Sequence, residues 1–315
     1  MRHLSLLLLL LLALVAACNK KPAPAPAAKP IAPEPAGPVN SAKVFYFGHS
    51  LVDQDMPLMV GSFAKARQKS WLAQGQLGWG TPLAEHYDWN GKFNEDAPLG
   101  FADENKNRPF FVGEGKAQIK SGKYDVMVIT ESNGHTKTEG DETVEYATKL
   151  SQLARKANPN MRIFLYSNSL DRKLFSSDDA WRAQTDKDIS WWESVADRVN
   201  AELDGPDLLV IPGGPILVAV TREAAAGKLP GLSVKDLFRK DDTVHVNDLG
   251  FYVIALAHYA AIFRDSPVGL PVETATEDGP AETLTPEAAA RIQDLVWSKL
   301  KSYPRSGIDL RDHKP

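Results

Sequence analysis

Two short motifs, far apart in the chain, carry the side chains that a nucleophilic mechanism needs. Ser50 lies in Gly-His-Ser-Leu, directly after the apolar run 44–47, and Asp242 and His245 lie in Asp-Thr-Val-His near the other end. A serine hydroxyl is a poor nucleophile at neutral pH, so it needs an imidazole to accept its proton and a carboxylate to orient that imidazole. We therefore predict Ser50 as the nucleophile, His245 as the base and Asp242 as the orienting carboxylate.

Each of these residues also has an ordinary structural explanation. Ser50 could cap the helix that follows it, because serine favours that position. His245 could be a packed or capping histidine, and Asp242 a surface charge. Asp241 or Asp248 could orient the imidazole in place of Asp242. The catalytic interpretation depends on a fold that brings the two motifs together.

At these residues the chain resembles the SGNH (GDSL-type) hydrolases, a family of esterases, lipases and carbohydrate deacetylases. Ser50 matches the first block of that family, and Asp242 with His245 matches the last; the resemblance covers residues 43–264. It implies a serine esterase that hydrolyses a short, acetyl-type ester on a glycan or small metabolite. An acyltransferase with the same triad is an alternative, and so is a non-catalytic binding lipoprotein that retained the fold.

The middle blocks of that family supply the oxyanion hole, and here they match less closely. Gly80 lies in a glycine block, Leu-Gly-Trp-Gly-Thr-Pro-Leu, in which Gly78 is the alternative donor. Asn133 is in register with the family's asparagine, although Glu131 stands where the family has a glycine. His49 likewise replaces the aspartate that usually precedes the serine. The resemblance implies Gly80 and Asn133 as the oxyanion donors.

Apolar runs of strand length alternate with segments of helical periodicity. The strand candidates are rich in branched and aromatic residues, as in strands buried on both faces, and span 44–47, 71–77, 125–130, 162–167 and 208–211. The helix candidates span 141–157, 189–203 and 247–263, and Thr285-Pro286 marks the start of another. This alternation predicts an α/β fold, a three-layer αβα sandwich with a mostly parallel five-stranded sheet. The family resemblance makes it a flavodoxin-like SGNH hydrolase fold.

Ligands bind at the carboxyl ends of the strands in such sheets. Ser50, Gly80 and Asn133 each follow a strand candidate, so we expect them at one edge of the sheet. Trp79 and Trp89 flank the glycine block and are candidates for substrate contact through their aromatic faces.

The first residues have the pattern of an export signal. Arg2 is followed by an apolar core at 4–14, which is shorter than the roughly 20 residues that span a bilayer. The sequence Val-Ala-Ala-Cys resembles a bacterial lipobox and predicts cleavage before Cys18 and acylation of Cys18, for example with palmitate. We therefore expect a lipoprotein anchored in the bacterial envelope, at the outer membrane facing the periplasm. An ordinary signal peptide with an incidental cysteine is the alternative.

The composition divides the rest of the chain. We predict a signal peptide at 1–17, a lipidated, Pro/Ala-rich tether at 18–40, a hydrolase-like domain at 41–304 and a tail at 305–315. A tether of this composition behaves as an extended, semi-rigid spacer.

Several kinds of site are not indicated by the sequence. With a single cysteine the chain has no internal disulfide and no thiolate metal site. Its net charge of −4 and the lack of a basic cluster argue against nucleic acid as a partner. His49, His86 and His135 lack the spacing of metal ligands, and His258 lies in an apolar helix where packing is expected. We predict no metal and no cofactor, with an ester substrate and a membrane as the partners.

Overall fold

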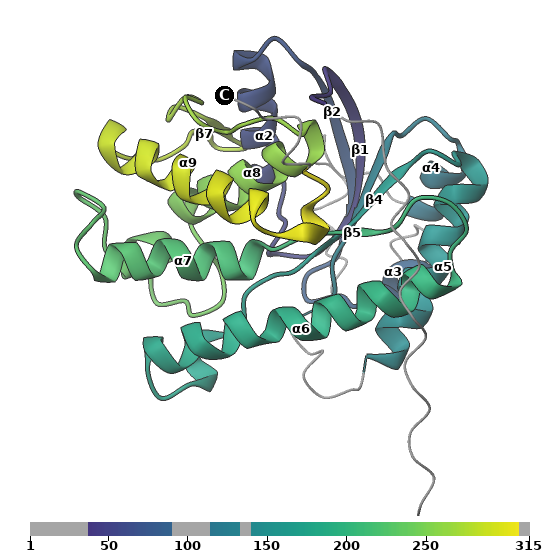
Figure 1. Cartoon of the computed structure of the whole chain (residues 1–315), viewed down its shortest axis with the longest axis horizontal. Coiled ribbons are helices and arrows are strands. Elements are labelled where there is room, and N and C mark those ends of the chain that lie inside the picture. The colour runs from purple at the N-terminus through teal and green to yellow at the C-terminus, as the bar shows by residue number, and fades with distance from the viewer. Residues whose placement is uncertain (1–36, 90–113, 133–139, 309–315) are drawn as a thin grey trace, which may run out of the picture. The chain divides into compact units, whose positions relative to one another are not determined.

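The computed structural model describes residues 37–89, 114–132 and 140–308, all within one unit of the chain, 31–315. At its centre is a five-stranded sheet with the order β2-β1-β3-β4-β5, in which every neighbouring pair is parallel (Figure 1). The strands are β1 (Ser41–Gly48), β2 (Ser70–Leu77), β3 (Val126–Ile129), β4 (Arg162–Tyr166) and β5 (Leu209–Ile211). All five predicted strands are confirmed, and their order is that of flavodoxin-like folds.

Helices cover both faces of this sheet (Figure 1). One face carries α2 (Asp55–Ala66), α7 (Gly213–Ala225), α8 (Asp248–Phe263) and α9 (Pro286–Lys301). The other carries α3 (Leu83–Asp88), α4 (Gly115–Lys120), α5 (Asp141–Ala157) and most of α6 (Asp178–Glu202). Short 3-10 turns, η3 (Arg172–Leu174), η4 (Val234–Leu237) and η5 (Pro304–Ser306), and a hairpin, β6 (Ala275–Thr276) with β7 (Gly279–Pro280), complete the described elements. The predicted three-layer arrangement is confirmed.

The side chains of β1 show how one strand serves two hydrophobic cores. Val44 and Tyr46 belong to the core on the α8 side, and Phe45 and Phe47 belong to the core on the α5 side. This is the alternation of a strand, in which successive side chains point to opposite faces. Because both faces are covered, the strand is apolar throughout, and the sequence shows a continuous apolar run.

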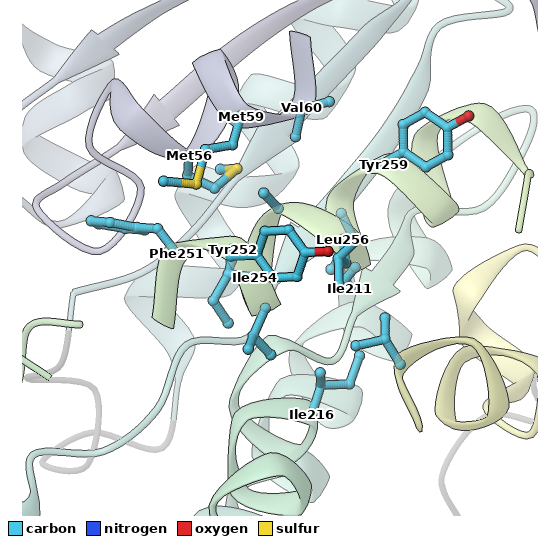
Figure 2. Close-up of a cluster of buried hydrophobic side chains, with 14 of the residues drawn as sticks. Met56, Met59, Val60, Ile211, Ile216, Phe251, Tyr252, Ile254, Leu256 and Tyr259 are labelled. Atoms are coloured by element: carbon cyan, nitrogen blue, oxygen red, sulfur yellow. The ribbon is translucent and has the colours of Figure 1, made fainter. Parts of the chain in front are cut away.

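Helix α8 is buried on nearly all sides, as its apolar sequence predicts. Figure 2 shows Phe251 and Tyr252 of α8 close to Met56 and Met59 of α2. A helix that is hydrophobic all round belongs in the interior. By its position α8 fixes the segment that precedes it, which carries Asp242 and His245.

The predicted helices are present, and the structure adds others. Helix α5 has the predicted bounds, α6 begins earlier than residue 189, and Thr285 caps α9 by accepting the Ala288 N–H at 3.2 Å. No helix range was predicted for α2 or α7. Proline and glycine lie within α2, and α7 opens with Gly-Gly-Pro and is apolar on most sides, so neither shows the usual amphipathic pattern.

The chain enters this unit at the amino end of β1. The Val39 N–H donates to the Phe263 carbonyl at 2.8 Å, and Lys69 Nζ donates to the Val39 carbonyl at 2.8 Å. Residues 37–40 are thus attached beside the end of α8. Cys18 and the predicted signal peptide lie outside the described residues. Within the described ranges, no helix has both the length and the apolar character needed to cross a membrane.

Candidate active site

Ser50 lies in a tight turn between β1 and α2. The Val52 and Asp53 N–H groups donate to the His49 carbonyl at 2.8 and 3.1 Å, which closes the turn, here called the Ser50 loop (residues 49–54). A Cβ at Gly48 would lie 2.6 Å from the Val52 side chain, so the turn requires glycine there. The residue at the cap position of α2 is Gln54. The alternative in which Ser50 caps the helix therefore does not apply.

The second motif forms a turn of its own, residues 238–246, here called the His245 turn. Phe238 and Val246 pair as an isolated antiparallel bridge, and the Arg239 N–H donates to the His245 carbonyl at 3.0 Å. Inside the turn, Asp242 Oδ1 accepts the N–H groups of Val244 at 2.7 Å and His245 at 2.9 Å. One oxygen of the carboxylate thus organises the backbone and leaves the other for the imidazole.

The two motifs meet at the carboxyl edge of the sheet. His245 Nδ1 lies 2.7 Å from Asp242 Oδ2, and His245 Nε2 lies 2.8 Å from Ser50 Oγ. Asp242 occupies the orienting position that Asp241 or Asp248 could have taken. The imidazole and the Asp242 carboxylate are partly exposed, with 28% and 29% of the side chains accessible. A small molecule can therefore reach them from solvent.

The protonation states of this group follow from the hydrogen bonds. Desolvation raises the pKa of Asp242, but hydrogen bonds from the His245 and Val244 amides and from the His245 ring outweigh it and lower the pKa to about 2. An ionised carboxylate can only accept, so His245 Nδ1 carries the hydrogen. In the neutral imidazole, Nε2 then has a free lone pair that can accept the Ser50 hydroxyl proton.

Three hydrogen bonds that the sequence did not reveal hold the His245 turn in place. Thr243 Oγ1 donates to Asp171 Oδ1 at 2.7 Å, and the Arg172 N–H donates to the Thr243 carbonyl at 3.1 Å, which joins the turn to the segment after β4. Arg239 Nη2 donates to Asp53 Oδ2 at 3.2 Å, which joins the turn to the Ser50 loop. In the sequence, the partners Asp171 and Asp53 are distinguished only as polar residues that follow a strand candidate.

The glycine block follows β2, next to β1. The Gly78 N–H donates to the Gly48 carbonyl at 3.0 Å, and the Thr81 N–H donates to the Gly78 carbonyl at 3.1 Å. Gly80 is exposed and has φ +68°, a left-handed conformation that favours glycine. The amide of Gly78 is therefore already engaged, whereas Gly80 has no acceptor within the described ranges.

The block after β3 is described only as far as Ser132, so Asn133 lies outside the described residues. Glu131 is buried, and its carboxylate accepts the Ser132 N–H at 2.7 Å and the Thr143 hydroxyl at 2.9 Å. The residue that replaces the family's glycine thus ties this segment to the start of α5.

Other candidates from the sequence are placed as follows. Trp89 is buried in the core on the α8 side, so it is not exposed for substrate contact, whereas Trp79 is half-buried. His258 is fully buried against Tyr46 and Tyr166, as expected of a packed histidine. His135 lies outside the described residues. In the part of the chain that is described, no group of three or more histidine, cysteine or acidic residues could hold a metal ion.

Comparison with known proteins gives relatives by structure alone. No protein-family model matches the chain, and no curated protein sequence matches it. A DUF4886 family protein from Bacteroides uniformis is 14% identical, with a TM-score of 0.51 over 87% of this chain and 100% of that chain.

Two further structures are less alike. A protein proposed to be an SGNH hydrolase, from Slackia heliotrinireducens, is 18% identical, with a TM-score of 0.45 over 70% of this chain and 98% of that chain. A carbohydrate esterase family 3 protein from Talaromyces cellulolyticus is 14% identical, with a TM-score of 0.40 over 71% and 97%. The likeness is one of fold. The predicted α/β fold, a five-stranded parallel sheet flanked by helices, is confirmed.

Proposed function

We propose that the protein is a serine hydrolase of the SGNH type that cleaves an ester bond. The observation that carries the proposal is the hydrogen-bonded series from Asp242 through His245 to Ser50, with distances of 2.7 and 2.8 Å. Each atom is the one that the chemistry requires, because Nδ1 faces the carboxylate and Nε2 faces the hydroxyl. The sequence resemblance, which placed these three residues in catalytic roles, supports the same reaction.

The proposed reaction runs in two steps. Ser50 Oγ attacks the ester carbonyl while His245 Nε2 accepts its proton, and Asp242 stabilises the resulting imidazolium. His245 then gives the proton to the leaving alkoxide, so that an alcohol departs and the acyl group stays on Ser50. In the second step a water molecule gives a proton to His245 and attacks the acyl-enzyme. His245 then returns that proton to Ser50 Oγ as the acyl carbon–Oγ bond breaks, which releases a carboxylic acid and the free serine.

The oxyanion of each tetrahedral intermediate needs N–H donors. We propose the amides of Ser50 and Gly80, neither of which has an acceptor within the described ranges. Gly78 is the poorer choice because its N–H already donates to Gly48. Each such donor typically lowers the barrier by about 3 kcal/mol. Asn133 remains the proposed third donor on the strength of the sequence register.

The proposed substrate is a short acyl ester, of the acetyl type, carried by a glycan or a small metabolite. The support is the resemblance of the motifs to those of esterases and carbohydrate deacetylases. We also propose that the protein is exported and anchored through acylated Cys18 in the cell envelope, which the lipobox-like sequence supports.

The decisive test compares the wild-type protein with Ser50→Ala. Both are assayed on p-nitrophenyl esters of increasing acyl length and on acetylated glycans, and both are treated with a fluorophosphonate that labels activated serines. We expect turnover that is fastest on the shortest acyl groups, and labelling of Ser50, in the wild type alone. Equal turnover by Ser50→Ala, or no turnover and no labelling in the wild type, would overturn the proposal.

A further inference from the structure

A buried polar cluster lies beside the Ser50 loop. It consists of His49, Thr130, Glu131 and Asn168, all of which are almost inaccessible to solvent. Its members follow the carboxyl ends of the neighbouring strands β1, β3 and β4. Buried polar groups are costly unless they are hydrogen-bonded, so the bonds within this cluster fix its geometry closely.

The ring of His49 has one defined tautomer. Its Nδ1 accepts the Leu51 N–H at 3.3 Å, so Nδ1 carries a lone pair. In a neutral imidazole the hydrogen is then on Nε2, which lies 2.9 Å from the Glu131 carbonyl and donates to it. One ring therefore bonds the residue after Ser50 on one side and the segment after β3 on the other.

Asn168 donates to the same carbonyl from the β4 side. Its Nδ2 lies 2.8 Å from the Glu131 oxygen and 3.1 Å from Thr130 Oγ1. It also lies 3.5 Å from His49 Nε2, but both of these atoms are donors, and the two point at a shared acceptor. The Glu131 carbonyl is thus held by two buried side chains that follow two different strands, β1 and β4.

The far end of Glu131 is held as well. Its carboxylate accepts the Ser132 N–H and the Thr143 hydroxyl at 2.7 and 2.9 Å. The segment after β3 is therefore fixed at both its carbonyl and its side chain. The bond from the His49 side chain links this fixed segment to the Ser50 loop.

His49 does not serve as a second base. Both ring nitrogens are engaged in bonds to the backbone, and the residue is only 2% accessible. The hydroxyl of Ser50 already lies against His245. The contribution of His49 to a reaction at Ser50 must come through the placement of the loop.

We propose that His49 is a positioning residue, which holds the Ser50 loop against the segment after β3 so that the serine keeps its place beside His245. This inference rests on the proposed hydrolase function, because its expected effect is on the rate of ester hydrolysis at Ser50. A misplacement of about 1 Å can cost about 100-fold in rate when a catalytic group is involved. His49 directly precedes Ser50 in the chain, so a shift of the His49 ring would also shift the serine.

The test uses three substitutions in the full-length protein. In His49→Gln the side-chain amide can reach Glu131 and keep the donor. His49→Asn is too short for that contact and keeps only the acceptor for Leu51, whereas His49→Phe removes both. We expect kcat to fall about 10- to 100-fold in the Asn and Phe variants with little change in KM, and His49→Gln to keep most of the wild-type kcat.

The control is Ile292→Ala, which removes a buried side chain of α9 and destabilises the fold away from the site. Activities are compared at equal fractions of folded protein. A loss in His49→Phe no greater than that of the control would overturn the inference, and so would a His49→Gln variant as poor as His49→Phe.

Amide hydrogen exchange separates this inference from the proposed function. We expect the Leu51 and Ser132 amides to exchange faster in His49→Phe, and the Ser132 amide to stay protected in His49→Gln, whether or not any ester is hydrolysed. Unchanged exchange at both amides in His49→Phe would overturn the positioning role. If the variants show this exchange pattern but the wild type neither turns over esters nor is labelled at Ser50, the proposed function is overturned and the positioning role is kept.

Discussion

Thr243 and Asp171 are joined by a hydrogen bond of 2.7 Å between the threonine hydroxyl and the carboxylate. Thr243 lies between Asp242 and His245, and Asp171 lies after β4, so the bond attaches the His245 turn to the sheet. Desolvation raises the pKa of Asp171, but the bonds from Thr243 and from the amide and side chain of Lys173 outweigh it and lower the pKa. The carboxylate is thus ionised at neutral pH and can hold Thr243 as an acceptor.

The first prediction concerns this attachment. Thr243→Val removes the hydroxyl, keeps the shape, and leaves the Arg172 bond to the Thr243 carbonyl intact. We expect a loss of about 1 kcal/mol in unfolding free energy and about a tenfold fall in kcat, because the turn is less firmly held. Denaturant unfolding and ester kinetics measure both. Thr243→Ser keeps the hydroxyl and should behave like the wild type; an equal loss in Thr243→Ser would contradict the explanation.

The second prediction concerns the three residues as a unit. Ser50→Ala and His245→Ala should each lower kcat by about 10⁴- to 10⁶-fold, and the double variant should be little worse than either. Asp242→Asn should cost less than Ser50→Ala, since the nucleophile stays in place while the ring loses its orientation. Single-turnover kinetics on a p-nitrophenyl ester checks the order. Effects that multiply in the double variant would show that Ser50 and His245 act separately.

The third prediction separates the proposed role of Gly80 as an oxyanion donor from the effect of backbone strain at that position. Gly80→Ala places a Cβ in open space but at φ +68°, so we expect about 1 kcal/mol of strain. Gly227→Ala is a matched control, because Gly227 has φ +67°, equally open space, and a position after α7. Both variants should lose similar unfolding free energy, but only Gly80→Ala should lose 10- to 1000-fold in kcat, as expected when an oxyanion donor shifts. A similar kcat in both variants would remove Gly80 from the oxyanion hole.

The fourth prediction concerns acid stability. Burial lowers the pKa of His258 from 6.5 to about 3, and its ring nitrogens have no hydrogen-bond partner within the described ranges. Between pH 6.5 and 3 the unfolded chain therefore binds a proton that the folded chain does not, and stability falls as the pH falls. The slope per buried histidine is at most about 1.4 kcal/mol per pH unit.

His258→Phe should flatten this dependence, because the ring that resists protonation is gone. His86 should still contribute, since burial, aided by His49 and opposed by a bond with the Gly48 backbone, lowers the pKa of His86 to about 3. Denaturant unfolding at several pH values measures the slope. An unchanged slope in His258→Phe would show that His258 does not control acid stability.

The fifth prediction concerns the amino terminus. Cys18→Ser should abolish the incorporation of labelled palmitate and release the protein from membranes, because Cys18 is the only cysteine in the chain. Wild-type protein should float with outer-membrane vesicles on a density gradient. A Cys18→Ser variant that remains labelled and membrane-bound would end the lipoprotein proposal and leave an ordinary signal peptide.

The strands and the two outer motifs could be predicted from the sequence because their cause is local. An apolar run such as 44–47 is buried on both faces wherever it lies in the sheet, and Asp242 and His245 share one turn. The partners Asp171 and Asp53 could not be predicted, because each meets the His245 turn only through tertiary folding. Single carboxylates after a strand have no periodicity to distinguish them from surface charges.

The same reasoning explains why the sequence did not reveal the partners of His49 and Gly78. In the sequence, His49 is only a departure from the aspartate that usually precedes the serine in the family. The structure shows that its ring bonds to the Glu131 carbonyl. The resemblance favours Gly80 and leaves Gly78 as the alternative, and the bond from the Gly78 N–H to the Gly48 carbonyl, which the sequence could not show, supports the same choice. Helix α7 was missed because its apolar residues surround the helix, so that its burial, rather than its periodicity, specifies it.

The hydrogen bond from Val39 to Phe263 has a practical consequence for how the protein can be handled. It fixes the incoming chain at the amino end of β1, and Ser50 follows the carboxyl end of the same eight-residue strand, about 26 Å away along the sheet. A fusion partner, a fluorophore or a solid support coupled at Gly37 is therefore attached at the opposite end of the strands from Ser50. Protein immobilised through that end would present Ser50 to the bulk solution, which suits it to a test of the proposed esterase activity on polymeric esters that cannot enter a porous matrix.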